Sequence, residues 1–228
     1  MKSNANSDRF EKIFRILEDC YGSPVCAPEY PPLDELIHTI LSQSTSAANY
    51  TAAFRGLRDH FPSWEDVRDA DIRDIEDAIR MGGLAKTKAA RIKQILGDIS
   101  TEHGRLDIDF LTYMSDDDAI DYLMRFDGVG IKTAACVLMF SLCRRVLPVD
   151  THIHRICGRL DLIDPCISAE EAYHALKAIC LPDKRYSFHI NLVTHGRRVC
   201  RSTRPLCDTC SLLSECGFGV RYMESGDL

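Results

Sequence analysis

Apolar residues recur at helical spacing along nearly the whole chain, and this periodicity limits the folds open to it. Leu33, Leu36, Ile37, Ile40 and Leu41 follow the three-to-four spacing of one helix face. Further stretches repeat this spacing, and serines stand where helix N-caps are expected, at Ser46, Ser63 and Ser115. The sequence contains no long stretch with the period of two that half-buried strands need. The pattern therefore predicts an all-α protein.

The chain of 228 residues is long enough for one large domain or two small lobes. Its sequence holds no apolar run near the roughly 18 to 20 residues of a membrane span. The segment MKSNANSDRFEKIF lacks the apolar run and cleavage site of a secretory signal. We therefore expect a cytoplasmic protein, associated with the nucleoid if the source is bacterial, that is neither secreted nor bound to a membrane.

The charged residues are unevenly distributed along the sequence. A net charge of -6 taken alone argues against a nucleic-acid-binding protein. Residues 65–77 hold seven acids against two arginines, whereas basic residues form two runs, Lys86, Lys88, Arg91 and Lys93, then Arg197, Arg198, Arg201 and Arg204. A DNA duplex responds to the charge within about 8 to 10 Å, so these runs keep DNA binding open. Solvated helix faces are the alternative interpretation.

A Gly-Val-Gly turn between two helical patterns carries the most information about function. In FDGVGIKTA, Gly128 and Gly130 permit close approach of the backbone to another molecule. A tight turn that opens a helix directs free N–H groups outward, which makes an anion site suited to phosphate. Lys132 lies in the first turn of that helix, where the dipole disfavours its charge and favours a neutral, nucleophilic amine. An ordinary surface lysine is the alternative.

Pro148 breaks the chain before an apolar-then-acidic segment, Val149-Asp150-Thr151-His152. Asp150 is placed to cap the next helix, where the dipole keeps a carboxylate ionised. An ionised carboxylate beside a neutral amine can activate it and can stabilise positive charge that develops on a sugar. Asp150 is therefore a candidate both for capping and for catalysis.

Four of the eleven cysteines follow a C-x6-C-x2-C-x5-C spacing near the C-terminus, at Cys200, Cys207, Cys210 and Cys216. Four thiolates so close in sequence suit either a zinc ion or a four-iron cluster. The spacing has one close pair and two single cysteines, which matches paired zinc knuckles poorly. Spacing alone leaves both groups open.

GVGIKTAACVL followed by LPVDTHIHRICGRL resembles the helix-hairpin-helix glycosylase superfamily, and within it the endonuclease III group. The resemblance implies a two-lobed all-α fold. A six-helix barrel lobe with the hairpin spans residues 32–145, and residues 1–31 and 146–228 form an iron–sulfur cluster lobe. It further implies that Lys132 forms a Schiff base and that Asp150 is the catalytic carboxylate. The Gly128-Val129-Gly130 hairpin would grip a DNA phosphate, with a monovalent cation bound there.

The resemblance also assigns residues that contact DNA. Gln43 matches the glutamine that fills the gap left by a flipped base, and Leu84 matches the leucine that enters the stack from the other side. Because extruding a base costs a few kcal/mol, such plugs offset part of that cost. A core leucine and a polar helix end are the alternatives for Leu84 and Gln43. We add His152, beside Asp150, to the expected DNA contacts.

The resemblance selects a 4Fe–4S cluster for the four cysteines. The first two ligands close a loop that displays Arg201 and Arg204, which we expect to contact phosphate. The chain departs from the family at Asp127, where proline is common, and at Ser46, where classical bacterial members have an acid. We expect Asp127 to loosen the turn and to add negative charge near the phosphate site.

We therefore expect a monomeric base-excision enzyme that acts on double-stranded DNA with a damaged base or an abasic site. It would remove a damaged, oxidised pyrimidine and cleave the strand by β-elimination. A monofunctional mismatch or alkyl-base glycosylase is one alternative, and a non-catalytic iron–sulfur DNA-binding protein is another. Lys132 argues against the first, because the resemblance implies that such relatives lack this lysine, and the presence of both Lys132 and Asp150 argues against the second.

Overall fold

A computed structural model describes residues 2–225, with side chains from Ser7 onward. Within these residues every regular element is helical, which confirms the predicted all-α, two-lobed class. The α-helices are α1 (Lys2–Tyr21), α2 (Pro32–Ser42), α3 (Ala47–His60), α4 (Trp64–Asp69), α5 (Ile72–Ala78), α6 (Ala85–His103), α7 (Asp116–Met124), α8 (Ile131–Leu142), α9 (Thr151–Arg159), α10 (Ala169–Ile179), α11 (Arg185–Arg198) and α12 (Gly217–Ser225). Short 3-10 turns join them: η1 (Arg80–Gly82), η2 (Asp109–Tyr113), η3 (Pro182–Lys184), η4 (Cys207–Thr209) and η5 (Leu213–Glu215).

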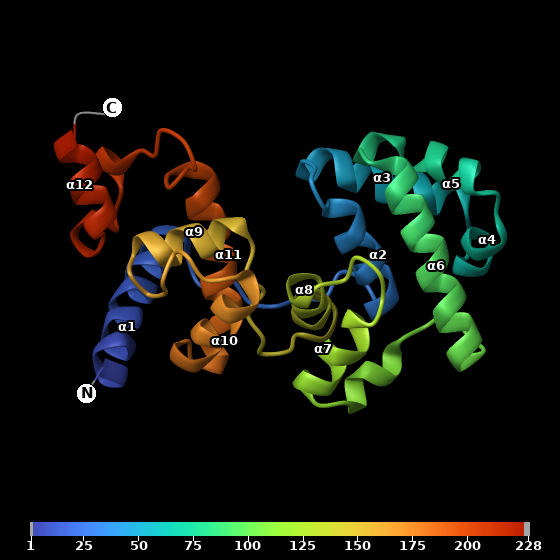
Figure 1. Ribbon diagram of the computed structural model, residues 1–228, viewed down its shortest axis with the longest axis horizontal. Helices are drawn as coiled ribbons and strands as arrows, with labels where there is room; N and C mark the ends of the chain where they lie inside the picture. The colour runs from blue at the N-terminus through green and yellow to red at the C-terminus, as the bar shows by residue number, and fades with distance from the viewer. Residues whose placement is uncertain (1, 226–228) are drawn as a thin grey trace. The chain divides into compact units, whose positions relative to one another are not determined.

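The chain divides into two compact units (Figure 1). The central unit comprises residues 27–144, and the terminal unit combines the residues up to Cys26 with those from Arg145 onward. The terminal unit therefore joins segments that are far apart in the sequence. Among the described residues, no helix is both long enough and apolar enough to cross a membrane.

The central unit is organised around α2, which packs against α3, α6 and α8. Leu36, Ile37, Ile40 and Leu41 of α2 are fully buried, as their spacing predicted. Helix α8 is buried over most of its circumference, from Thr133 to Met139. Since α2 and α8 pack together, their ends are fixed by a shared core. This packing places the C-terminal end of α2 against the turn that precedes α8.

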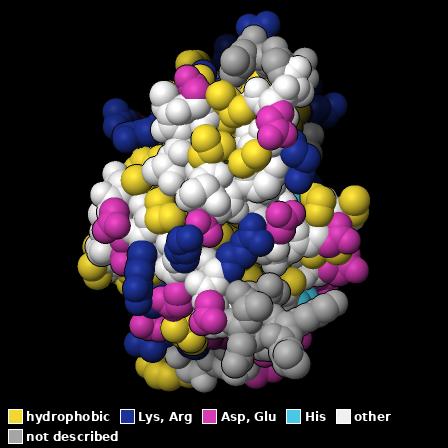
Figure 2. All heavy atoms as spheres, turned by 90° about the vertical axis from the view of Figure 1, so that its left-hand side faces the viewer, with side chains coloured by type: hydrophobic (Ala, Val, Ile, Leu, Met, Phe, Trp, Pro, Cys, Tyr) yellow, Lys and Arg dark blue, Asp and Glu magenta, His cyan; other side chains and the backbone are white. Residues whose placement is uncertain are grey.

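The terminal unit is held together by aromatic packing of α1 on α11. Phe10 of α1 meets Phe188 of α11 edge to face, with the ring centroids 4.9 Å apart. Helix α9 packs against α11 and α12, which positions the segment from Cys200 to Cys216 beside it. On the face drawn in Figure 2, basic and acidic side chains are interspersed rather than gathered by sign.

Candidate functional site

The Gly-Val-Gly turn is an uncapped helix entry in the central unit. Gly128 adopts a left-handed φ of 71°, which a side chain would strain. Val129 is buried and its N–H donates to the Phe126 carbonyl over 3.1 Å, which fixes the turn. Gly130 is the N-cap of α8, and no described side chain caps this helix. The first N–H groups of α8 are thus available to an anion.

Gln43 follows the last residue of α2 and lies against the hairpin. Its amide Nε2 donates to the Gly128 carbonyl over 3.1 Å and to Thr133 Oγ1 over 3.4 Å. Its Oε1 accepts from Arg91 Nη1 over 3.0 Å. The amide is therefore oriented by the hairpin itself, and the structure brings Gln43 together with the predicted phosphate site.

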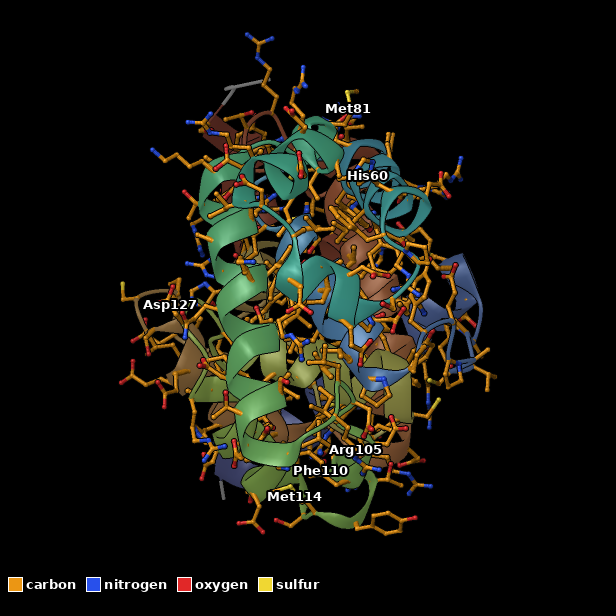
Figure 3. The ribbon with its side chains drawn as sticks, turned by 90° about the vertical axis from the view of Figure 1, so that its right-hand side faces the viewer. His60, Met81, Arg105, Phe110, Met114 and Asp127 are labelled. Atoms are coloured by element: carbon orange, nitrogen blue, oxygen red, sulfur yellow. The ribbon has the colours of Figure 1, made fainter. Side chains whose placement is uncertain are left out.

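Arg91 of α6 links Gln43 to the position where the sequence departs from the family. Its Nε lies 3.4 Å from Asp127 Oδ2, and Asp127 is exposed at the side of α6 (Figure 3). A Cβ added to Gly128 would lie 1.8 Å from Arg91 Cζ, so the guanidinium needs a glycine there. Asp127 thus pairs with a cation that the turn already holds. The sequence did not assign Arg91 a role beyond its basic run.

Leu84 lies in a strained and exposed position just before α6. Its φ of 51° and ψ of 33° are left-handed, and its side chain is 61% exposed. Gly83 before it also has a positive φ, of 68°. Met81 on the same segment is exposed at the top of the view in Figure 3. The alternative of a core leucine is therefore wrong.

Lys132 occupies the first turn of α8, two residues after the N-cap Gly130. It is half-buried, whereas the next residue, Thr133, is buried. It belongs to the central unit, together with Gln43, Leu84 and the hairpin. A residue with a primary amine is therefore in the same helical turn as the N–H groups of the anion site.

Asp150 belongs to the terminal unit and is the N-cap of α9. Its Oδ1 accepts from the Ile153 N–H over 2.8 Å, so the predicted capping interaction is present. Asp150 is half-buried, which leaves part of the carboxylate accessible.

His152 is held in the first turn of α9 by an arginine of the same helix. Arg155 Nη2 donates to His152 Nδ1 over 3.0 Å. Because a guanidinium only donates, Nδ1 is unprotonated and a neutral ring carries its proton on Nε2. Burial lowers the pKa of His152, although Asp150 raises it, and the Arg155 charge lowers it again.

The four predicted ligand cysteines line one cavity in the terminal unit. The other lining residues are mostly apolar: Ile156, Arg159, Leu160, His195, Val199, Pro205, Leu206, Leu212, Leu213, Phe218 and Gly219. Among the described side chains, no three His, Cys, Asp or Glu gather closely enough for a single metal ion. A four-iron cluster binds each thiolate through a different iron, so its ligands lie farther apart than those around one zinc ion.

The donor groups around this cavity fit a cluster of thiolates. The Gly219 N–H donates to Cys216 Sγ over 3.2 Å, and Arg159 Nη1 donates to Cys200 Sγ over 3.2 Å. Burial raises the pKa of the Cys210 thiol to about 11, so without a cation this sulfur is protonated. An iron–sulfur cluster supplies the positive charge that keeps thiolates ionised, and N–H donors then stabilise its sulfurs.

Two arginines of α9 fix the loop between the first two cysteines. Arg159 donates to the carbonyls of Arg201 over 2.7 Å and Ser202 over 3.1 Å, and Arg155 donates to the Cys200 carbonyl over 2.8 Å. Arg201 and Arg204 are both exposed on this loop, and Arg204 has a left-handed φ of 48°. The loop is thus shaped from α9. Sequence reasoning missed this support, although the i, i+4 spacing of the two arginines places them on one helix face.

Comparisons with known proteins agree on one family. Residues 37–182 match the family of HhH-GPD superfamily base excision DNA repair proteins. The chain is 39% identical over 165 residues to a provisionally named DNA glycosylase of Arabidopsis thaliana, which covers 72% of the chain and 56% of that protein. It is 32% identical over 191 residues to endonuclease III of Thermotoga maritima, which covers 83% of the chain and 84% of that protein.

A solved structure has the same fold. This trapped covalent intermediate of endonuclease III with DNA matches with a TM-score of 0.83 at 24% identity, covering 95% of the chain and 98% of its own. The chain spans about half the length, 56%, of the plant relative.

Proposed function

The chain belongs to the HhH-GPD superfamily of base excision DNA repair proteins, and we propose that it is a DNA glycosylase that also cleaves the strand at the abasic site. One observation carries this proposal: Lys132 is in the first turn of α8, which begins directly after the uncapped Gly-Val-Gly hairpin. An anion site followed by a half-buried amine is suited to holding a DNA phosphate while a nucleophile meets the adjoining sugar.

Lys132 is the proposed nucleophile. Its neutral amine attacks the sugar C1′, the bond from C1′ to the base breaks, and the base leaves with that electron pair and a proton. Loss of a proton from nitrogen and opening of the sugar ring give a Schiff base at C1′. Removal of a C2′ proton then expels the 3′ phosphate, and water releases the lysine. Asp150 supplies the negative charge that stabilises the sugar cation.

We propose that the hairpin and two residues that fill the gap left by the extruded base, called the plug residues here, bind the DNA. The N–H groups from Gly130 onward bind a phosphate of the damaged strand, and a monovalent cation completes the hairpin site. Gln43 and Leu84 fill the space that the extruded base leaves. An exposed leucine held in a left-handed conformation supports this role, because strain of this kind persists where the surroundings fix it.

We propose that Cys200, Cys207, Cys210 and Cys216 hold a 4Fe–4S cluster that serves as a scaffold. A bound cluster would hold the four sulfurs as thiolates, offset part of their charge and join the loop, η4 and α12 into one body. Arg155 and Arg159 brace the same loop from α9. The arginines it displays then meet phosphate with little loss of conformational entropy.

Replacing Cys207 with alanine is expected to remove the cluster and to unfold the loop it closes. Iron content and visible absorbance fall to background, and the melting transition drops sharply, because metal binding supplies folding free energy. Cys166→Ala is the control, since Cys166 is an exposed free thiol of the same unit. Full iron content in the Cys207 variant would contradict the assignment of Cys207 as a ligand. Zinc in place of iron in the wild type would mean that the four cysteines bind zinc and not a cluster.

Replacing Arg201 and Arg204 together with alanine is expected to weaken DNA binding and to flatten its salt dependence. Each phosphate contact contributes about 0.9 to the slope of log Kobs against log salt, so the slope falls by about 2. The double variant Arg73→Ala, Arg105→Ala removes the same charge from exposed positions of the central unit. If both double variants shift the slope equally, only net charge is at work and the loop has no special contact.

Borohydride reduction on an abasic duplex tests the proposed function. The wild-type chain is expected to become covalently attached to DNA, because the reagent reduces a Schiff base to a stable amine. Release of a base from a duplex that contains a lesion, without a covalent adduct on the abasic duplex, favours the monofunctional glycosylase. DNA binding without base release or an adduct favours the non-catalytic protein. A set of duplexes with thymine glycol, dihydrouracil, uracil and 8-oxoguanine then identifies the base, for which we propose an oxidised pyrimidine.

A further inference from the structure

A buried ammonium group lies between the two proposed plug residues. Lys88 of α6 is 1% exposed, although the sequence groups it with a basic run. Its Nζ donates to the Leu41 carbonyl over 2.7 Å and to the Gly82 carbonyl over 2.9 Å. The charge is thus directed inward onto backbone and is not presented to a DNA duplex.

The two acceptor carbonyls lie at corresponding places in the central unit. Leu41 is in the last turn of α2 and precedes Gln43 by two residues. Gly82 ends η1 and precedes Leu84 by two residues. Both carbonyls are at C-terminal helix ends, where a positive charge is favoured. One ammonium therefore joins the backbone segments that carry the two plugs.

The surroundings of Lys88 leave little freedom for this junction. A Cβ added to Gly82 would lie 2.9 Å from Ala53 Cβ, so η1 is packed closely onto α3. Beyond it, Gly83 and Leu84 both have positive φ values, of 68° and 51°. Burial lowers the pKa of Lys88, and its ammonium group makes hydrogen bonds to both carbonyls. A side chain that lacks the donors would leave both carbonyls unpaired.

We propose that Lys88 is a positioning residue that sets the spacing between Gln43 and Leu84, and that extrusion of a paired base depends on it. This inference rests on the proposed glycosylase function. Lys88 does not touch the reacting atoms; it acts through the backbone of the two plugs. Base extrusion needs both plugs at the correct separation, because the gap in a duplex has a fixed size.

Lys93 provides a matched control on the same helix. Its Nζ also donates to two backbone carbonyls, of Arg68 over 2.5 Å and of Ala70 over 2.6 Å. These carbonyls lie at the end of α4, away from either plug in the chain. Lys93→Met therefore removes the same kind of interaction as Lys88→Met without touching the segments that carry Gln43 and Leu84.

The experiment compares single-turnover base excision with borohydride capture on an abasic site that already exists. Lys88→Met is expected to slow excision of a paired lesion by about tenfold to a hundredfold, the scale of a misplacement of about 1 Å. The rate of capture at the preformed site, which needs no extrusion of a base, is expected to stay within about threefold of the wild-type rate. Lys93→Met leaves both rates near those of the wild type. An equal loss on both substrates, or unchanged excision, overturns the proposal.

Two further measurements keep the inference separate from folding and from the proposed chemistry. In a Leu84→Ala background, Lys88→Met adds no further loss of excision if it acts through the plugs, whereas a general structural defect is additive. If Lys88→Met does not fold, Lys88→Gln, which keeps one donor group, takes its place. The fluorescence of 2-aminopurine in a bound duplex reports base extrusion, even if the wild type excises no base. This fluorescence is expected to fall for Lys88→Met and to stay at the wild-type level for Lys93→Met.

Discussion

Lys132→Ala is expected to abolish covalent capture on abasic DNA and to lower strand cleavage by at least about 1,000-fold. Alanine cannot form a Schiff base, so the β-elimination step loses its covalent intermediate. Binding of an abasic duplex is expected to persist, because the anion site is made of backbone N–H groups at the start of α8. Gel separation of borohydride-reduced mixtures measures capture, and filter binding measures affinity.

Lys86→Ala is the control for this variant. Lys86 is exposed in the first turn of α6, and its replacement also removes one positive charge. It is expected to be captured as the wild type is. Capture of the Lys132 variant at the wild-type rate would mean that another residue is the nucleophile. Loss of binding together with capture instead assigns Lys132 to DNA binding.

Local sequence signals predicted the helices well because helix starts depend on neighbouring residues. Ser46, Ser63 and Ser115 each cap a helix, with side chains that accept from N–H groups three residues on. The apolar face of α2 is buried as its spacing indicates. Asp150 caps α9 as predicted. These features need only a few consecutive residues to specify them.

The sequence could not predict how basic side chains are used, because their partners are distant in the chain. Lys88 and Lys93 were assigned to a basic run, yet each binds backbone carbonyls from other helices. Arg91 pairs with Gln43 and Asp127. A run of charges looks the same in sequence whether it faces DNA, solvent or buried carbonyls. Only the packing of α6 on its neighbours distinguishes these cases.

The contacts of Asp127 also depend on the packing of α6 and could not be predicted from the sequence. We expected this residue to loosen the turn, because the family has proline there. A looser turn stays a prediction. In the structure the Val129 N–H donates to the Phe126 carbonyl within this turn, and the Asp127 carboxylate pairs with Arg91. The added negative charge is therefore partly offset by a neighbouring guanidinium, although an ion pair with so exposed a carboxylate contributes little to stability.

Asp150→Asn and Asp150→Ala are expected to separate the two roles of this carboxylate. Asparagine caps helices about as well as aspartate, so the bond from the Ile153 N–H is kept and only the charge is lost. Alanine loses the cap as well, which costs about 1 kcal/mol of the free energy of unfolding. If the charge stabilises the sugar cation, both variants lose about 1,000-fold in single-turnover excision.

Urea denaturation of the same two variants completes the comparison. The asparagine variant is expected to unfold at nearly the wild-type midpoint and the alanine variant at a lower one, while their excision rates are alike. Activity that follows the denaturation midpoint, with asparagine near wild type, would mean that Asp150 serves only as a helix cap. Equal stability with unequal activity would mean that the amide retains part of the catalytic role. The asparagine variant therefore removes the charge of the proposed catalytic role while it leaves the capping bond to the Ile153 N–H in place.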